Sequence, residues 1–278
     1  YYFDSIIRQD HFDENKLEPA DNLQEFDILD GAAIDHYASE AMRARATGKG
    51  VTATMPGTGL GDIALVPGPF LTDPKGIRDV TEWYVSLASR PDYIHSVFAK
   101  QTEIAIQNME LVRGAAGDNI DVAFVCGTDF GTQVSTFCSP DTFNELYLPY
   151  YRKINGWIHR NTPWKTFKHS CGAVAEFMPL FIDAGFDIIN PVQLSATGMD
   201  AKMLKDEYGE SLVFWGGVID TQKTLPFGSP KEVQAEARER CEIFLRQGGF
   251  VFNAIHNIQA KTPIENVAAL IEVAKEFR

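Results

Sequence analysis

Two kinds of stretch alternate along the chain from residue 77 to its end. Short, continuous apolar runs have the length of buried β-strands and lie at 120–126, 164–168, 186–190, 212–216 and 250–255. Amphipathic stretches with helical spacing predict helices at 77–87, 92–113, 140–161, 174–184, 201–208, 230–247 and 263–277. Ser139 and Thr262 stand where helix N-caps are expected. Before residue 77 the pattern is irregular, with a helix expected at 30–45 and a strand at 51–54.

Strands that are apolar throughout are typical of a parallel sheet covered by helices on both faces. We therefore expect an α/β fold, a (β/α)8 TIM barrel that forms a single domain over residues 1–278. A doubly wound sheet fits less well, because no glycine-rich phosphate turn opens the series and the alternation continues to the C-terminus. The sequence begins at Tyr1 rather than Met, so we expect part of the barrel's N-terminus to be missing from it.

Composition and charge narrow the classes of partner. The 278 residues are 45% hydrophobic, enough for a full core, and carry 25 Lys and Arg against 38 Asp and Glu, a formal net charge of −13. This acidity argues against nucleic acid or an anionic membrane as a partner, because both require a positive surface. The sequence has no apolar run long enough to cross a membrane. Four cysteines in a chain of this length form no disulfide framework, and we expect a reducing, cytoplasmic location.

Polar side chains follow five of the predicted strands, at the end where a barrel places its chemistry. Asp129 follows the first of these strands, the His169 and Cys171 pair the second, and Gln193 the third. Trp215 ends the fourth and Asp220 follows it, and His256 and Asn257 follow the fifth. We expect Asp129, Gln193, Trp215, Asp220 and Asn257 to line one cavity together with the ligands of a metal.

His169 and Cys171 form the most specific pattern. Residues i and i+2 of an extended strand point the same way, so the imidazole and the thiolate can share one metal ion. Zinc accepts this mixture, and a catalytic zinc has three protein ligands plus an open position, for which His256 is the third candidate. The alternative is a core histidine beside an inert buried cysteine.

Two acids complete the list of candidates. Asp129 and Asp220 could each act as a general base or as a displaceable fourth zinc ligand, and an equally open alternative is that they cap loops. The sequence contains no G-x-S-x-G nucleophile elbow.

The motifs at these positions resemble the uroporphyrinogen decarboxylase superfamily, including its zinc- and corrinoid-dependent methyltransferase branch. The matching segments are GTDFGTQ (127–133), SPDTFNELYLPYYRKI (139–154), HSCGAV (169–174), DAGFDIINPVQ (183–193), FWGGVIDTQKTLPFGSPKEV (214–233) and HNIQAKTPIENV (256–267). The resemblance covers roughly residues 120–278 and implies a (β/α)8 barrel. In the methyltransferase branch a His-x-Cys pair holds zinc, which matches His169 and Cys171. The third ligand, typically Cys, falls on His256.

The resemblance implies methyl transfer between a small methylated substrate and a corrinoid carried by a separate protein. One thiolate and two neutral imidazoles leave the zinc a net positive charge, which favours polarising the oxygen of a methyl ether, and we expect O-demethylation of an aromatic methyl ether. For such a substrate we expect aromatic and apolar cavity walls.

Two alternatives stay open. One is a metal-free decarboxylase acting on a tetrapyrrole, which would use an arginine-rich N-terminal motif that residues 1–30 do not show, and arginines in the cavity wall. The other is a barrel that only binds a ligand.

Overall fold

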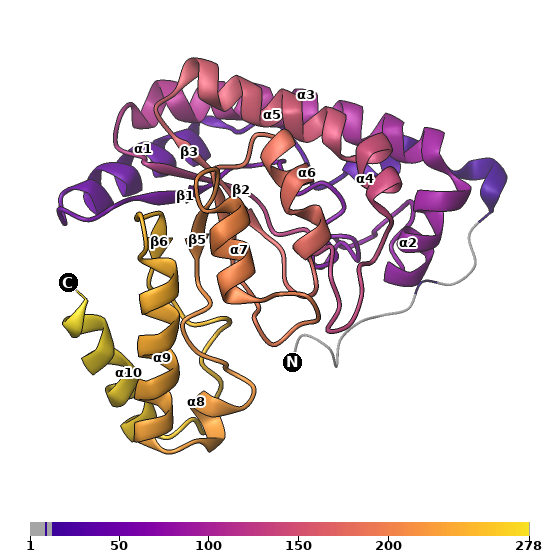
Figure 1. Cartoon of the computed structure of the whole chain (residues 1–278). Coiled ribbons are helices and arrows are strands. Elements are labelled where there is room, and N and C mark those ends of the chain that lie inside the picture. Colours follow the sequence, from indigo (N-terminus) through magenta and orange to yellow (C-terminus); the bar gives the residue numbers. More distant parts are fainter. Residues whose placement is uncertain (1–8, 10–12, 278) are drawn as a thin grey trace. The chain divides into compact units, whose positions relative to one another are not determined.

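The structure, a computed structural model, describes residue 9 and residues 13–277 (Figure 1). The chain forms two compact units. The first comprises the residues up to Thr128 together with Cys138–Phe167 and Asp183–Gly185, and the second comprises Asp129–Phe137, Lys168–Ile182 and the residues from Phe186 on. The expected single domain over 1–278 stays a prediction.

The described strands form one sheet in which they follow each other in chain order. They are β1 (Thr52–Thr54), β2 (Val122–Cys126), β3 (Lys165–His169), β4 (Ile188–Asn190), β5 (Val213–Trp215) and β6 (Phe250–Val251). The pairs β1–β2, β4–β5 and β5–β6 are parallel, as continuous apolar strands predict. The α/β class is therefore confirmed. Among the described residues the sheet has six strands with β1 and β6 at its edges, and it does not close into the eight-stranded ring of a complete barrel.

The first unit is built around its longest helix. Its helical segments are η1 (Glu14–Lys16), η2 (Pro19–Leu23), α1 (Gly31–Arg45), α2 (Val80–Ser89), α3 (Pro91–Ala116), α4 (Pro140–Leu146) and α5 (Leu148–Asn161). Helix α3 packs against α1, α2 and α5. The expected single helix at 140–161 is two helices that meet at Tyr147, because Pro149 has no N–H to continue the hydrogen-bond ladder. Ser139 caps α4 as predicted, accepting a hydrogen bond from the Thr142 N–H.

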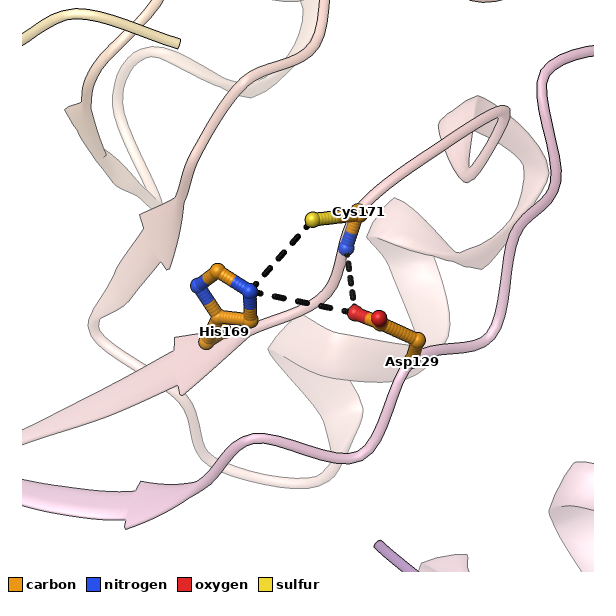
Figure 2. A group of neighbouring side chains, drawn as sticks. All are labelled: Asp129, His169 and Cys171. Atoms are coloured by element: carbon orange, nitrogen blue, oxygen red, sulfur yellow. Dashed lines mark hydrogen bonds and ion pairs between the residues drawn. The ribbon is translucent and has the colours of Figure 1, made fainter. Parts of the chain in front are cut away.

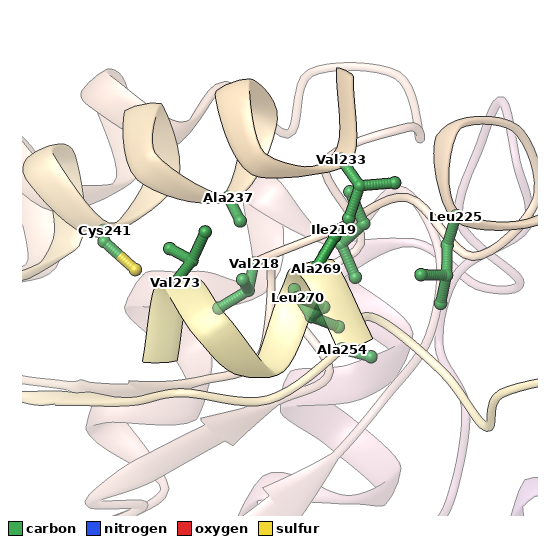
Figure 3. Packing of buried hydrophobic residues seen from close by; sticks show 10 residues of the cluster. All are labelled: Val218, Ile219, Leu225, Val233, Ala237, Cys241, Ala254, Ala269, Leu270 and Val273. Atoms are coloured by element: carbon green, nitrogen blue, oxygen red, sulfur yellow. The ribbon is translucent and has the colours of Figure 1, made fainter. Parts of the chain in front are cut away.

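The second unit carries the loops after β3, β4, β5 and β6. Its helical segments are η3 (Ala175–Phe177), α6 (Met178–Asp183), α7 (Ala201–Tyr208), α8 (Thr224–Phe227), α9 (Pro230–Phe244) and α10 (Ile264–Glu276). Helices α9 and α10 lie side by side (Figure 1). Their facing side chains, among them Ala237, Cys241 and Val273, join residues of the loops after β5 and β6 in one apolar cluster (Figure 3).

Two predicted boundaries in this unit differ from the structure. The N-cap position of α10 is Pro263 rather than Thr262, and it makes no side-chain cap. The strand expected at 250–255 ends at Val251, although Ala254 and Ile255 are buried as predicted for that run. The apolar residues after Val251 are buried without pairing in the sheet, so the apolar run is longer than the strand.

Two of the four cysteines are described as unpaired. Cys171 and Cys241 are free thiols, and the side chain of Cys126 lies outside the described part of the structure. No helix among the described residues is long and apolar enough to cross a membrane.

Candidate metal centre

The end of β3 presents two donor side chains on the same side of the chain. His169 is the last residue of the strand and Cys171 follows two positions later, so their side chains lie next to each other (Figure 2). The intervening Ser170 is buried, and its Oγ accepts a hydrogen bond of 2.9 Å from the Phe130 N–H. This bond ties the strand end to the loop that follows β2.

That loop brings a carboxylate to the pair. The Oδ1 atom of Asp129 accepts a hydrogen bond of 2.7 Å from the Cys171 N–H and lies 3.9 Å from Nε2 of His169 (Figure 2). The same Nε2 lies 3.4 Å from Sγ of Cys171. One donor atom from each of the three residues therefore lies within 4.8 Å of the other two.

Asn190, at the end of β4, determines which nitrogen of His169 faces this group. Its Nδ2 donates a hydrogen bond of 2.8 Å to the carbonyl of Trp215, so its Oδ1 is the atom 2.5 Å from Nδ1 of His169. A carbonyl oxygen can only accept, so Nδ1 carries the hydrogen and Nε2 offers its lone pair to Cys171 and Asp129. An outer hydrogen bond of this kind commonly sets the tautomer and orientation of a metal-binding histidine.

Burial governs the protonation of the pair. It lowers the pKa of His169, against the hydrogen bond that the imidazole donates to Asn190 and the Asp129 charge, which act to raise it. Burial, aided by the neighbouring Asp129, raises the pKa of the Cys171 thiol to about 12. Around neutral pH the metal-free site therefore holds a neutral imidazole and a protonated thiol.

A buried lysine contacts the backbone of the site. The side chain of Lys168 is fully buried, and its Nζ donates a hydrogen bond of 2.6 Å to the carbonyl of His169. Nζ also lies 4.9 Å from the ring centre of Phe130 and 5.6 Å from that of Phe181, within cation–π range. The lysine thus anchors the backbone of the histidine that the motif singled out.

Two cavities flank the group, and His256 borders both. A cavity of about 310 Å³ is bordered by Cys171 and His256, together with Gln193 and Asp220 from the sequence-derived list. A second cavity of about 720 Å³ is bordered by His169, His256 and Asn257. His256 is exposed and lies outside the cluster that Asp129 forms with His169 and Cys171.

The predicted site residues do not all border the same cavity. Asp129 contacts the cysteine but lines neither of these cavities, and Trp215 contributes a backbone carbonyl to the site through Asn190. Most residues that border the smaller cavity have polar side chains, with Ile255 as the aliphatic one. The larger cavity, beside His169, is bordered mainly by apolar side chains, among them Phe252 and Leu270. Asn190 and Lys168 were not among the predicted site residues. The only sequence signal for Asn190 was its place at the end of an apolar strand.

The donor set suits zinc. Zinc binds thiolate, imidazole and carboxylate ligands, and a catalytic site holds three of them with a fourth position open. The cluster lies at the carboxyl ends of parallel strands. This is where enzymes with a parallel α/β barrel carry their active sites.

Comparison with known proteins identifies the family. The family model described as uroporphyrinogen decarboxylase (URO-D) matches residues 63–277, more than half of the chain. The chain therefore belongs to the uroporphyrinogen decarboxylase family, as the motifs predicted.

Individual relatives are distant. A uroporphyrinogen decarboxylase of Carboxydothermus hydrogenoformans is 25% identical over 191 residues, which are 67% of this chain and 49% of that protein. One from Coxiella burnetii is 22% identical over 260 residues, 93% of this chain and 68% of that protein. A solved methyltransferase from Methanosarcina mazei superposes with a TM-score of 0.61 at 21% identity, covering 87% of this chain and 64% of its own. The chain thus spans about half of the first relative and under two thirds of the methyltransferase, and the structural likeness establishes the fold.

Proposed function

We propose that this protein is a zinc-dependent methyltransferase that moves a methyl group between a small methylated substrate and a corrinoid held by a separate protein. The observation that carries the proposal is the convergence of Asp129, His169 and Cys171 beside two cavities. The resemblance to the methyltransferase branch and the likeness in fold to a methyltransferase are compatible with it.

Three side chains would hold the zinc. Nε2 of His169, Sγ of Cys171 and Oδ1 of Asp129 are the donor atoms, and His256, which borders both cavities, is positioned to supply a further ligand. When bound, zinc would supply Lewis acidity toward an oxygen atom of the substrate. With Asp129 as a ligand, the added carboxylate charge makes the centre less electrophilic than the set of His169, Cys171 and His256 expected from the sequence.

The proposed reaction is O-demethylation, with an aromatic methyl ether as the donor. The methyl group passes from the ether oxygen to Co(I). The electron pair of cobalt forms the new bond, and the pair of the broken C–O bond stays on oxygen. Asp220, which borders the smaller cavity, is the residue we assign to proton exchange at that oxygen. Its Oδ1 also caps the loop, accepting hydrogen bonds from the N–H groups of Gln222 and Lys223.

A decarboxylase acting on a tetrapyrrole is the competing function, because the curated relatives carry that name. Such a substrate carries many carboxylates, each of which requires a cationic partner. Among the described residues that border the two cavities there is no arginine or lysine. The walls therefore favour methyl transfer over the decarboxylase.

Zinc content and methyl transfer test the proposal together. We expect about one zinc per chain by mass spectrometry, and zinc-dependent methylation of free cob(I)alamin, followed by the loss of its Co(I) absorbance. Asp129→Ala and His256→Ala, titrated separately, show which residue completes the set. A protein that binds no zinc, or that decarboxylates uroporphyrinogen by product chromatography, contradicts the proposal.

A further inference from the structure

Most residues that border the smaller cavity carry a side-chain group that can form hydrogen bonds. The loops after β2, β4, β5 and β6 each contribute an amide, and hydroxyl groups lie between them. The amide and hydroxyl side chains in the wall are Gln133, Gln193, Ser195, Thr221, Gln222 and Gln259. An amide offers both donors and an acceptor, so this wall can bind hydroxyl and carbonyl groups alike.

Charge is almost absent from the same wall. Asp220 is its one acidic residue, and none of the described residues around the cavity is a lysine or an arginine. Oδ1 of Asp220 is already engaged by two backbone N–H groups, at 2.7 Å from Gln222 and 3.2 Å from Lys223. An anionic ligand would meet this carboxylate with no lysine or arginine among the described residues around the cavity to pair with it, so these side chains disfavour negative charge.

Two of the glutamines are held in place beside the cysteine. Oε1 of Gln193 accepts a hydrogen bond of 2.9 Å from the Gly172 N–H, and its Nε2 donates one of 3.0 Å to Oε1 of Gln133. Because the Gln133 oxygen accepts this bond, its NH₂ group is the part that can donate to a ligand. Hydrogen bonds thus connect Gly172, next to Cys171, through Gln193 to Gln133, whose NH₂ group lies in the cavity wall.

Few of the described residues that border this cavity have apolar side chains. Among the described residues around the cavity, Ile255 is the one aliphatic residue and His256 the one aromatic residue. A ring without polar substituents would cover the amides and remove their hydrogen bonds to water without replacing them.

We propose that the methylated substrate in this cavity is uncharged and carries hydroxyl or carbonyl groups that the glutamines bind. This inference rests on the proposed methyl transfer and specifies its donor: a hydroxylated methyl ether rather than a plain aromatic ether or a methoxy acid. The NH₂ group of Gln133 is the donor that we expect to produce the preference for a hydroxylated ether.

The test measures binding without any methyl acceptor. Saturation-transfer NMR on the zinc-loaded protein compares methoxybenzene, 3-methoxyphenol and 3-methoxybenzoate, which differ in one substituent. We expect 3-methoxyphenol to bind about 5- to 10-fold more tightly than methoxybenzene, the effect of one neutral hydrogen bond, and 3-methoxybenzoate to bind weakest. Gln133→Leu should abolish most of this difference. The matched control is Gln107→Leu, which replaces an exposed glutamine of α3.

Each other outcome has a definite meaning. Equal or tighter binding of methoxybenzene, preference for the benzoate, or no binding of all three ligands overturns the substrate class. A preference that survives Gln133→Leu overturns the role of that residue. A protein that prefers 3-methoxyphenol but binds no zinc retains the substrate preference and refutes the methyltransferase proposal, so the two can fail separately.

Discussion

Replacing Gly172 by alanine should disrupt the turn that positions Cys171. Gly172 has φ +88°, a conformation that side chains disfavour, and its backbone approaches the loop after β2 closely. A Cβ atom there would lie 2.5 Å from the carbonyl oxygen of Thr132, and closer still to the carbonyl of Gly131. Both obstacles are backbone atoms, so no side-chain rotation relieves the overlap.

The loss in free energy of unfolding for Gly172→Ala can be estimated from the backbone strain and from the hydrogen bonds of this turn. The positive φ costs about 1–2 kcal/mol for a residue with a Cβ. If the turn moves, it also loses the hydrogen bonds from the Gly172 N–H to Gln193, at 2.9 Å, and from the Ala173 N–H to Thr132, at 2.8 Å. At about 1 kcal/mol each, these bring the expected loss in free energy of unfolding to about 3–4 kcal/mol.

Urea unfolding and zinc titration of Gly172→Ala measure both consequences. The matched control is Gly248→Ala, because Gly248 has φ +78° but its added Cβ would have nothing within 4 Å. The control should lose only about 1–2 kcal/mol from the backbone conformation and should keep its zinc affinity. If Gly172→Ala is as stable as the control and binds zinc like the parent protein, the turn does not depend on the close approach, and the reasoning is wrong.

Three further changes test the centre itself. Cys171→Ala should weaken zinc binding by more than about 100-fold in a competition titration. The control Cys241→Ala, in the apolar cluster of α9, should leave zinc binding unchanged. The reverse result would mean that the ligand is misassigned. Because the thiol pKa of Cys171 is raised to about 12 and that of the His169 imidazole is lowered, zinc binding near neutral pH should displace about one proton. Its affinity should then rise about tenfold for each pH unit between about pH 6 and 8, and calorimetry in buffers of different ionisation enthalpy would contradict this if it found no proton release. Asn190→Leu should reduce zinc affinity about 10- to 100-fold and alter the visible spectrum of the Co(II)-substituted protein, since the His169 imidazole loses its orienting acceptor; an unchanged spectrum would exclude that role.

The order of strands and helices could be predicted because it depends on local patterns. Continuous apolar runs identified β2, β3, β4 and β5 to within a few residues, and helical spacing identified α3, α7 and α9. The pairing of His169 with Cys171 followed from the two-residue period of an extended chain, which requires no tertiary information. Pro149 was visible in the sequence, and its effect on the helix at 140–161 was missed because the periodicity continues across it.

The composition of the site depended on contacts between segments far apart in sequence. Asp129 meets Cys171 across 42 positions, and Asn190 meets His169 across 21. The sequence placed these residues at strand ends but could not say which loop atoms would touch, because loop conformation depends on close backbone approaches such as that of Gly172 to Gly131. Strand ends follow from local chain geometry, whereas the third donor, the histidine tautomer and the polar cavity wall follow only from the way the loops fold against one another.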